Sequence, residues 1–194
     1  MFDQLTPDEQ AALWLSLKVS LAATMAALPP ALLVAFALAR WRFPGRTLLS
    51  GVVHMPLVLP PVVTGYVLLL LFGRRGAVGA FLYEHFGIVF SFRWTGAALA
   101  CAVMGFPLVV RAAQLAFESV DAKLEAAAST LGAGRAWVFL TVTLPLALPG
   151  VLAGFVLGFA KALGEFGATI TFVSNIPGET QTLPLAIYGL TQSP

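Results

Sequence analysis

Two opposite charges, Lys161 and Glu165, lie four residues apart inside a long apolar stretch. At this spacing the ammonium and the carboxylate share one face of a helix and can form an ion pair. A lone charge in the middle of a membrane costs about 3 kcal/mol on insertion scales, so a charge there needs a reason. Two readings stay open: a structural ion pair that seals helix packing, or a pair in which Lys161 has a functional role inside the membrane.

Other motifs that carry chemistry do not appear in the sequence. A G-x-x-x-x-G-K-[ST] phosphate loop, a Rossmann fingerprint and a catalytic triad are all missing, so we predict that the chain is not an enzyme and has no ATP site of its own. The single cysteine, Cys101, lies in the apolar run ALACAVMGF and is expected to be a small core residue. We predict no catalytic residue, cofactor, metal ion or nucleic acid for this chain.

The composition is that of a protein whose solvent is lipid. Of the 194 residues 59% are hydrophobic and only 10% are charged, and the mean hydropathy is +0.89. A soluble domain carries about 25% charged residues, because its surface must stay hydrated. The sequence therefore predicts an integral membrane protein.

The apolar residues are gathered into four long stretches, each sufficient for the about 20 helical residues that cross a bilayer. The fold class predicted is an all-α, polytopic membrane bundle. Residues 1–10 are acidic where a signal peptide would be basic, and we expect them to be an external lead-in. The predicted spans are residues 11–39, 48–72, 95–117 and 144–173.

Basic residues predict the orientation. The loop 40-RWRFPGR-46 holds three arginines and no acid, which places it in the cytoplasm by the positive-inside rule. The N-terminus and residues 73–94 are then outside, and residues 111–143 are inside. Arg74 and Arg75, in the outer loop, oppose this assignment.

Prolines interrupt the apolar stretches repeatedly. A proline inside a helix removes a backbone hydrogen bond and bends the helix, and in lipid the freed carbonyl needs another partner. The repeated prolines favour one of two structures: packing kinks in a helix bundle, or broken helices around a solute path. The prolines are Pro29, Pro30, Pro56, Pro60, Pro61 and Pro107.

A polar segment between the third and fourth stretches predicts a cytoplasmic elbow, residues 121–143. Asp121 can cap a helix over 122–130, and Gly132 and Gly134 permit the turn that ends it. A second short helix, 135–142, would lead to the next span, which starts at Leu-Pro. The smooth alanine face of the first of these two helices, with the fixed turn of the elbow, suits docking into a groove on another protein.

At these residues the chain resembles the "EAA" loop of bacterial ABC importer permeases, with E-A-A, a glycine and then L-P. The resemblance implies a coupling helix that inserts into a separate ATPase subunit. One departure is that the family's usual glutamate position falls on Ala126, and Glu125 lies one residue earlier. The implied coupling residues are Glu125, Ala126, Ala127, Ala128, Leu131, Gly132, Ala133, Gly134 and Pro145.

Further along, the run 162-ALGEFGATITFVSNIPGETQTLP-184 resembles the molybdate importer permeases. Sulfate permeases share its glycines and glutamate, whereas SNIPGET points to molybdate. The stretches 54–66 and 73–79 also resemble the molybdate permeases. The resemblance covers nearly the whole chain from about Leu13. That family continues into one more span, so we expect this chain to be C-terminally truncated.

The resemblance implies a type I ABC transmembrane domain over residues 11–194, in the bacterial cytoplasmic membrane. ATP and Mg²⁺ would be bound by the partner ATPase, an external oxyanion-binding protein would deliver the ion, and a second copy would complete the path within membrane lipid. Molybdate would cross by alternating access. The alternatives are a permease for sulfate, tungstate or another oxyanion, and an assembly subunit without transport.

For an oxyanion cargo, hydroxyl and amide donors suit a path better than fixed cations, which would hold a dianion too strongly for release. The same side chains often bond backbone carbonyls within spans, which is the alternative. The candidate path residues are Thr64, Lys161, Glu165, Thr169, Thr171, Ser174 and Asn175.

Overall fold

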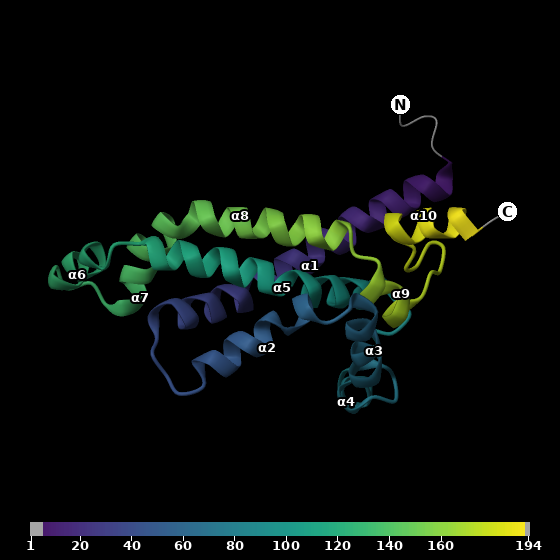
Figure 1. Ribbon diagram of the computed structural model, residues 1–194, viewed down its shortest axis with the longest axis horizontal. Helices are drawn as coiled ribbons and strands as arrows, with labels where there is room; N and C mark the ends of the chain where they lie inside the picture. Colours follow the sequence, from purple (N-terminus) through teal and green to yellow (C-terminus); the bar gives the residue numbers. More distant parts are fainter. Residues whose placement is uncertain (1–5, 193–194) are drawn as a thin grey trace.

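The computed structural model describes residues 6–192, and every regular element within that range is a helix. Three long helices, α1 (Pro7–Arg40), α5 (Trp94–Ser119) and α8 (Leu144–Leu163), lie side by side as a bundle (Figure 1). This arrangement confirms the all-α prediction. The shorter helices are α2 (Arg46–Val58), α3 (Pro61–Phe72), α4 (Ala77–Phe86), α6 (Ala122–Thr130), α7 (Arg135–Val138), α9 (Gly167–Val173) and α10 (Leu183–Gln192).

Helix α1 begins earlier than predicted. The Thr6 hydroxyl accepts from the Glu9 backbone N–H, the Glu9 carboxylate accepts from the Thr6 N–H, and Pro7 occupies the first turn. This capping box starts the helix at Pro7. Residues 7–10 of the predicted lead-in are therefore helical, and residues 1–5 lie outside the described range.

The second predicted span is two helices rather than one. Between α2 and α3 the chain bends by 114° at Leu59 and Pro60, which both have extended backbone. Pro60 and Pro61 supply no N–H to continue the helix, so the break costs few hydrogen bonds. The other prolines named above remain inside continuous helices. Only one of the sequence's two Pro-Pro pairs therefore interrupts its helix.

The fourth predicted span, residues 144–173, is also divided. Helix α8 ends at Leu163, and a short break through Gly164 and Glu165 leads into α9. Helix α9 turns away from α8 and packs against α3. Three helices among the described residues are long and apolar enough to cross a membrane, and α2 with α3 makes a fourth if the bent pair counts as one span.

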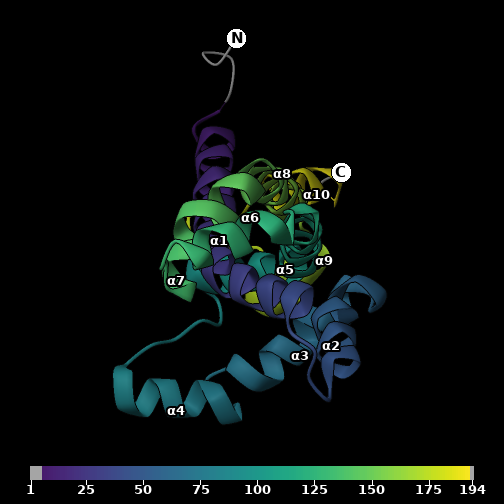
Figure 2. The same ribbon diagram turned by 90° about the vertical axis from the view of Figure 1, so that its left-hand side faces the viewer.

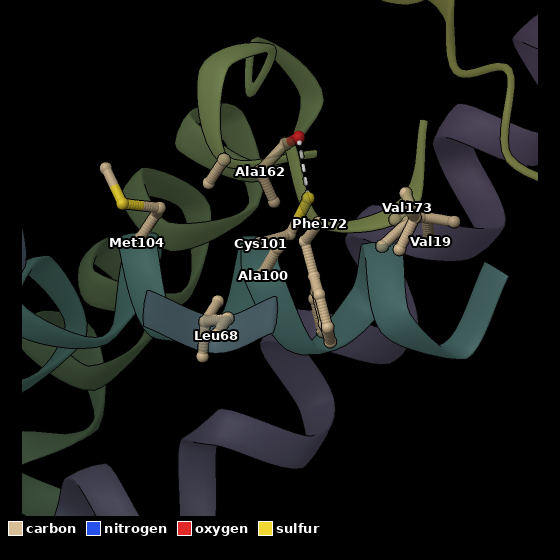
Figure 3. Close-up of a cluster of buried hydrophobic side chains, with 11 residues drawn as sticks. Val19, Leu68, Ala100, Cys101, Met104, Ala162, Phe172 and Val173 are labelled. Atoms are coloured by element: carbon tan, nitrogen blue, oxygen red, sulfur yellow. Dashed lines mark hydrogen bonds between the residues drawn. The ribbon is translucent and has the colours of Figure 1, made fainter. Parts of the chain in front are cut away.

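Small residues allow the long helices to approach closely. The buried stripe of α1 consists mainly of alanine, serine and threonine, and α1 makes its most extensive contact with α5 along it. Between α5 and α8, Gly158 lies against Val109, where a side chain would have no room. Figure 3 shows one buried cluster, in which the Cys101 thiol donates to the Ala162 carbonyl 3.5 Å away. This confirms Cys101 as a core residue.

The last described helix, α10, lies against the first half of α1. The Leu183 backbone N–H donates to the Ser16 hydroxyl at 2.6 Å, and the Asn175 side chain donates to the Leu185 carbonyl at 3.1 Å. These bonds fix the polar loop after α9 to the bundle.

Candidate functional site: the elbow and the break between α8 and α9

The elbow helix α6 occupies the residues predicted for it. Asp121 accepts a hydrogen bond from the Lys123 backbone N–H at 2.9 Å, which caps the first turn. Gly132 ends the helix with φ of +88°, and the Ala133 N–H donates to the Ala128 carbonyl at 3.2 Å. Figures 1 and 2 show α6 and α7 at the end of the bundle opposite α10.

The second elbow helix is not separate from the following span, which corrects the prediction for residues 135–142. Helix α7 passes into a π-helical turn, Phe139–Thr143, and then directly into α8, so that Arg135–Leu163 is one helix of 29 residues. In the π-helical turn the Leu144 N–H bonds to the Phe139 carbonyl. Since Pro145 has no N–H, a change of hydrogen-bond pattern just before it costs little.

Glu125 joins the elbow to the bundle. Its Oε1 accepts from Arg40 Nη2 at 2.9 Å and from the Thr143 hydroxyl at 2.7 Å. Arg40 Nη2 also donates to the Val120 carbonyl at 3.2 Å. Both charged side chains are mostly buried, 20% and 23% exposed. One carboxylate therefore connects the end of α1, the helix α6 and the start of the helix that becomes α8.

Sequence reasoning selected Glu125 but did not find its partners. The signal for Arg40 was present, because the arginine cluster and the elbow were placed on the same side of the membrane. The displacement of the glutamate by one residue has a structural counterpart: Glu125 makes the tertiary contacts, whereas Ala126 is exposed.

The elbow presents apolar side chains away from the bundle. Leu131 is 89% exposed and Trp137 is 64% exposed. Leu131 precedes the turn at Gly132, and Trp137 lies in α7 after it. Trp137 was not among the predicted coupling residues. Among the predicted coupling residues not yet described, Ala126, Ala127 and Gly134 are exposed, and Ala128 and Ala133 are partly exposed. Pro145 lies in the first turn of α8.

The charged pair inside the apolar region is formed. Lys161 Nζ lies 2.6 Å from Glu165 Oε2, and the Glu165 side chain is only 1% exposed. Glu165 Oε1 also accepts from the Ala168 backbone N–H at 2.9 Å. The carboxylate thus caps the start of α9 while it neutralises the lysine. This geometry favours the structural reading, although the Lys161 side chain remains 30% exposed.

Two of the four predicted hydroxyl donors are occupied by local backbone. Thr169 donates to the Phe166 carbonyl at 2.8 Å, and Thr171 donates to the Gly167 carbonyl at 2.9 Å. Asn175 is used to hold α10, as described above. Ser174 is exposed and has a positive φ of 65° at the end of α9. The alternative given for these side chains therefore applies to the two threonines of α9.

Thr64 differs from the other candidates. It is buried in α3, and its hydroxyl has no hydrogen-bond partner among the described residues. The next residue, Gly65, lies directly against the backbone of Ala168 in α9. The structure thus brings Thr64 to the helix that follows Glu165. In the described part of the chain no cluster of three or more His, Cys, Asp or Glu could hold a metal ion.

The apolar bundle and its polar elbow define a helical membrane protein with several spans. The chain belongs to the family described as "Binding-protein-dependent transport system inner membrane component", which matches residues 27–192. A solved structure entitled "Crystal structure of an amino acid ABC transporter with histidines" has the same fold, with a TM-score of 0.64 at 20% identity, over 99% of this chain and 83% of that one.

Several relatives are considerably more similar to this chain in sequence than that solved structure is. "Molybdenum transport system permease protein ModB" of Escherichia coli (strain K12) is 62% identical over 190 residues, which cover 98% of this chain and 83% of that protein. ModB of Mycobacterium tuberculosis is 45% identical, over 94% of this chain and 69% of that protein. "Sulfate transport system permease protein CysT" of Salmonella typhimurium is 43% identical, over 81% of this chain and 56% of that protein.

Proposed function

We propose that this chain is the permease subunit of an ATP-driven importer that moves molybdate across the bacterial cytoplasmic membrane. The substrate assignment is supported by the 62% identity to ModB of Escherichia coli over 98% of the chain. The coupling assignment is supported by the elbow and by the contact of Glu125 with Arg40 and Thr143. The chain itself catalyses no reaction in this proposal.

The contact of Glu125 with Arg40 and Thr143 is the observation on which the mechanism depends. A separate ATPase, which binds ATP and Mg²⁺, would bind the exposed side chains of the elbow. Because Glu125 bonds both the end of α1 and the helix continuous with α8, displacement of α6 is transmitted to two spans at once. Two copies of the chain would form the path, and an external binding protein would deliver the oxyanion. Nucleotide-driven closure would then alternate the access of that path.

The same contact supports the orientation that we propose. Arg40 begins the arginine-rich loop 40–46, and its contact with Glu125 supports placing that loop and the elbow on one side of the membrane. The positive-inside rule makes this side cytoplasmic and the first turn of α1 external.

We place the oxyanion path beside the break between α8 and α9. Lys161 offers a partly exposed ammonium whose charge is already balanced by Glu165. Because the Glu165 carboxylate cancels most of its charge, Lys161 can donate a hydrogen bond to a dianion without holding it as tightly as an isolated cation would. Thr64 offers a hydroxyl on the neighbouring α3.

Uptake by reconstituted vesicles tests the proposal. Vesicles that contain the chain, its ATPase and its binding protein should accumulate radiolabelled molybdate with ATP, and not with a non-hydrolysable analogue. Sulfate in excess should compete weakly. Uptake of sulfate without molybdate would assign the chain to the sulfate permeases instead. An assembled complex that moves neither anion would favour an assembly role without transport.

A further inference from the structure

A polar cavity opens between α1, α2 and α5 near the arginine-rich loop. Its volume is about 510 Å³. Helix α2 runs beside α1 and α5 (Figure 1), and Val53 is the residue of α2 that is buried against them. Most of the side chains that line the cavity are polar: Arg46, Thr47, Ser50, His54 and Gln114.

A second cavity lies deeper between the same three helices and is almost entirely apolar. Its volume is about 430 Å³. It is open along one side, where Val52 of α2 is exposed. Its lining includes Ala27, Pro30, Val53, Pro56, Ala102 and Phe106.

The two cavities are lined by successive parts of the same three helices, and we treat them as one groove. On α2 the lining passes from Arg46 to Pro56, and on α5 from Gln114 to Leu99. At about 1.5 Å per residue these separations are about 15 Å and 23 Å. One leaflet of a bilayer has a hydrocarbon depth of about 15 Å, half of the total. A groove with its polar end at the membrane surface therefore has an apolar end that reaches at least the midplane.

The charge at the polar end favours an anion. Arg46 is the one charged side chain in the lining of the polar cavity, and the hydroxyls of Thr47 and Ser50 add donors. His54 Nδ1 lies 2.8 Å from the Ser50 carbonyl; since a carbonyl only accepts, Nδ1 carries the proton of this bond. Arg40, in contrast, is already engaged by Glu125.

We propose that this groove binds an anionic phospholipid of the cytoplasmic leaflet, with its phosphate at Arg46 and one acyl chain in the apolar cavity. Basic pockets between spanning helices on this side of a membrane are suited to such head groups. A free oxyanion would use the polar end but gain nothing from an apolar groove one leaflet deep. The proposal needs the orientation given above but is independent of the transported ion.

Native mass spectrometry of the purified full chain tests the proposal, with phosphatidylglycerol and phosphatidylcholine as probes. Phosphatidylglycerol should bind in preference. Arg46→Gln should weaken it about fivefold, the effect of about 1 kcal/mol per basic side chain at a membrane surface. Arg42→Gln, an exposed arginine of the same loop outside the lining, is the matched control and should have little effect.

The apolar end is tested separately. Val52→Phe should obstruct the groove and reduce lipid binding, whereas Val58→Phe, more exposed on the same helix and outside the lining, should not. Equal effects of the two arginine variants would overturn the proposal, because they would indicate general surface charge. It would also fail if molybdate or inorganic phosphate bound in an Arg46-dependent manner while Val52→Phe was neutral. Loss of a dimer in place of loss of lipid with Val52→Phe would show that a second copy covers the groove, and would overturn it too.

Discussion

Arg40 and Glu125 are 85 residues apart in the sequence, and their side chains meet at 2.9 Å between the end of α1 and the elbow. The same carboxylate oxygen accepts from Thr143 at 2.7 Å. Two charge-assisted hydrogen bonds converge on one oxygen atom, and such bonds are shorter and stronger than neutral ones. The elbow is thus attached to the bundle by polar contacts, since α6 buries no residue of its own.

Removing either charge should loosen the elbow without unfolding the bundle. We expect Arg40→Gln and Glu125→Gln each to lower ATP-dependent uptake and the yield of co-purified ATPase. A double-mutant cycle on unfolding in detergent should give a coupling energy of about 1 kcal/mol, because the pair is mostly but not fully buried.

Lys123→Gln is the matched control for this pair. Lys123 lies on the same helix and is exposed, so its loss should leave stability and uptake nearly unchanged. A coupling energy near zero between Arg40 and Glu125, with normal uptake in both single variants, would contradict the role given to the contact.

The two elbow glycines should differ in their tolerance of a side chain. Both have open space around them, but Gly132 has φ of +88° and Gly134 has φ of −67°. Valine at position 132 must adopt a left-handed conformation at a cost of about 1–2 kcal/mol, whereas valine at 134 meets no such strain. Gly132→Val should therefore reduce ATPase co-purification more than Gly134→Val does. Equal retention of the ATPase by both variants would argue against the coupling role of the turn.

How far the sequence predicts this molecule depends on whether a feature is local. The helix cap at Asp121 and the turn at Gly132 are set by neighbouring residues, and both were predictable. The contact of Arg40 with Glu125 joins distant segments, so no spacing rule could reveal it. The pair Pro29-Pro30 stays inside α1 while Pro60-Pro61 breaks the helix.

The last comparison shows why the sequence alone could not place the helix break. Both pairs lack the same N–H groups, but α1 is packed along α5, whereas α3 leaves the direction of α2 to pack on α9. Tertiary contacts decide between a tolerated proline and a broken helix. The same limit applies to the path donors: Thr169 and Thr171 could be chosen by type, but only the structure shows that their hydroxyls bond nearby carbonyls.

Breaking the ion pair between Lys161 of α8 and Glu165 in the break after it should destabilise the protein asymmetrically. Lys161→Met leaves the Glu165 carboxylate buried without its counter-charge, which costs about 3 kcal/mol. Glu165→Gln should cost less, because its amide oxygen can still accept from the Ala168 N–H. The double variant should recover part of the loss of Lys161→Met. Thermal unfolding temperatures of the three variants in detergent measure this order of stability.

Lys18→Met serves as the control for the loss of a lysine from an apolar helix. The Lys18 ammonium lies 4.0 Å from the centre of the Trp94 ring, and its contact should contribute about 0.5–1 kcal/mol. If Lys161→Met proved no more costly than Lys18→Met, the ion pair would have no structural role of the kind described.

The contact of α3 with α9 depends on the absence of a side chain at Gly65. A Cβ there would lie 2.5 Å from the Ala168 carbonyl oxygen and 2.8 Å from its Cα, and backbone atoms cannot yield as a flexible side chain can. Gly65→Ala should cost about 1–3 kcal/mol, as overpacking does, and should shift α3 with Thr64 away from the break after α8. Gly164→Ala is the control, since its Cβ would meet no atom closer than 3.8 Å. The thermal unfolding temperature in detergent and the rate of molybdate uptake should both fall for Gly65→Ala. Both should stay unchanged for Gly164→Ala. Unchanged uptake by a destabilised Gly65→Ala protein would separate the packing of α3 from the transport path.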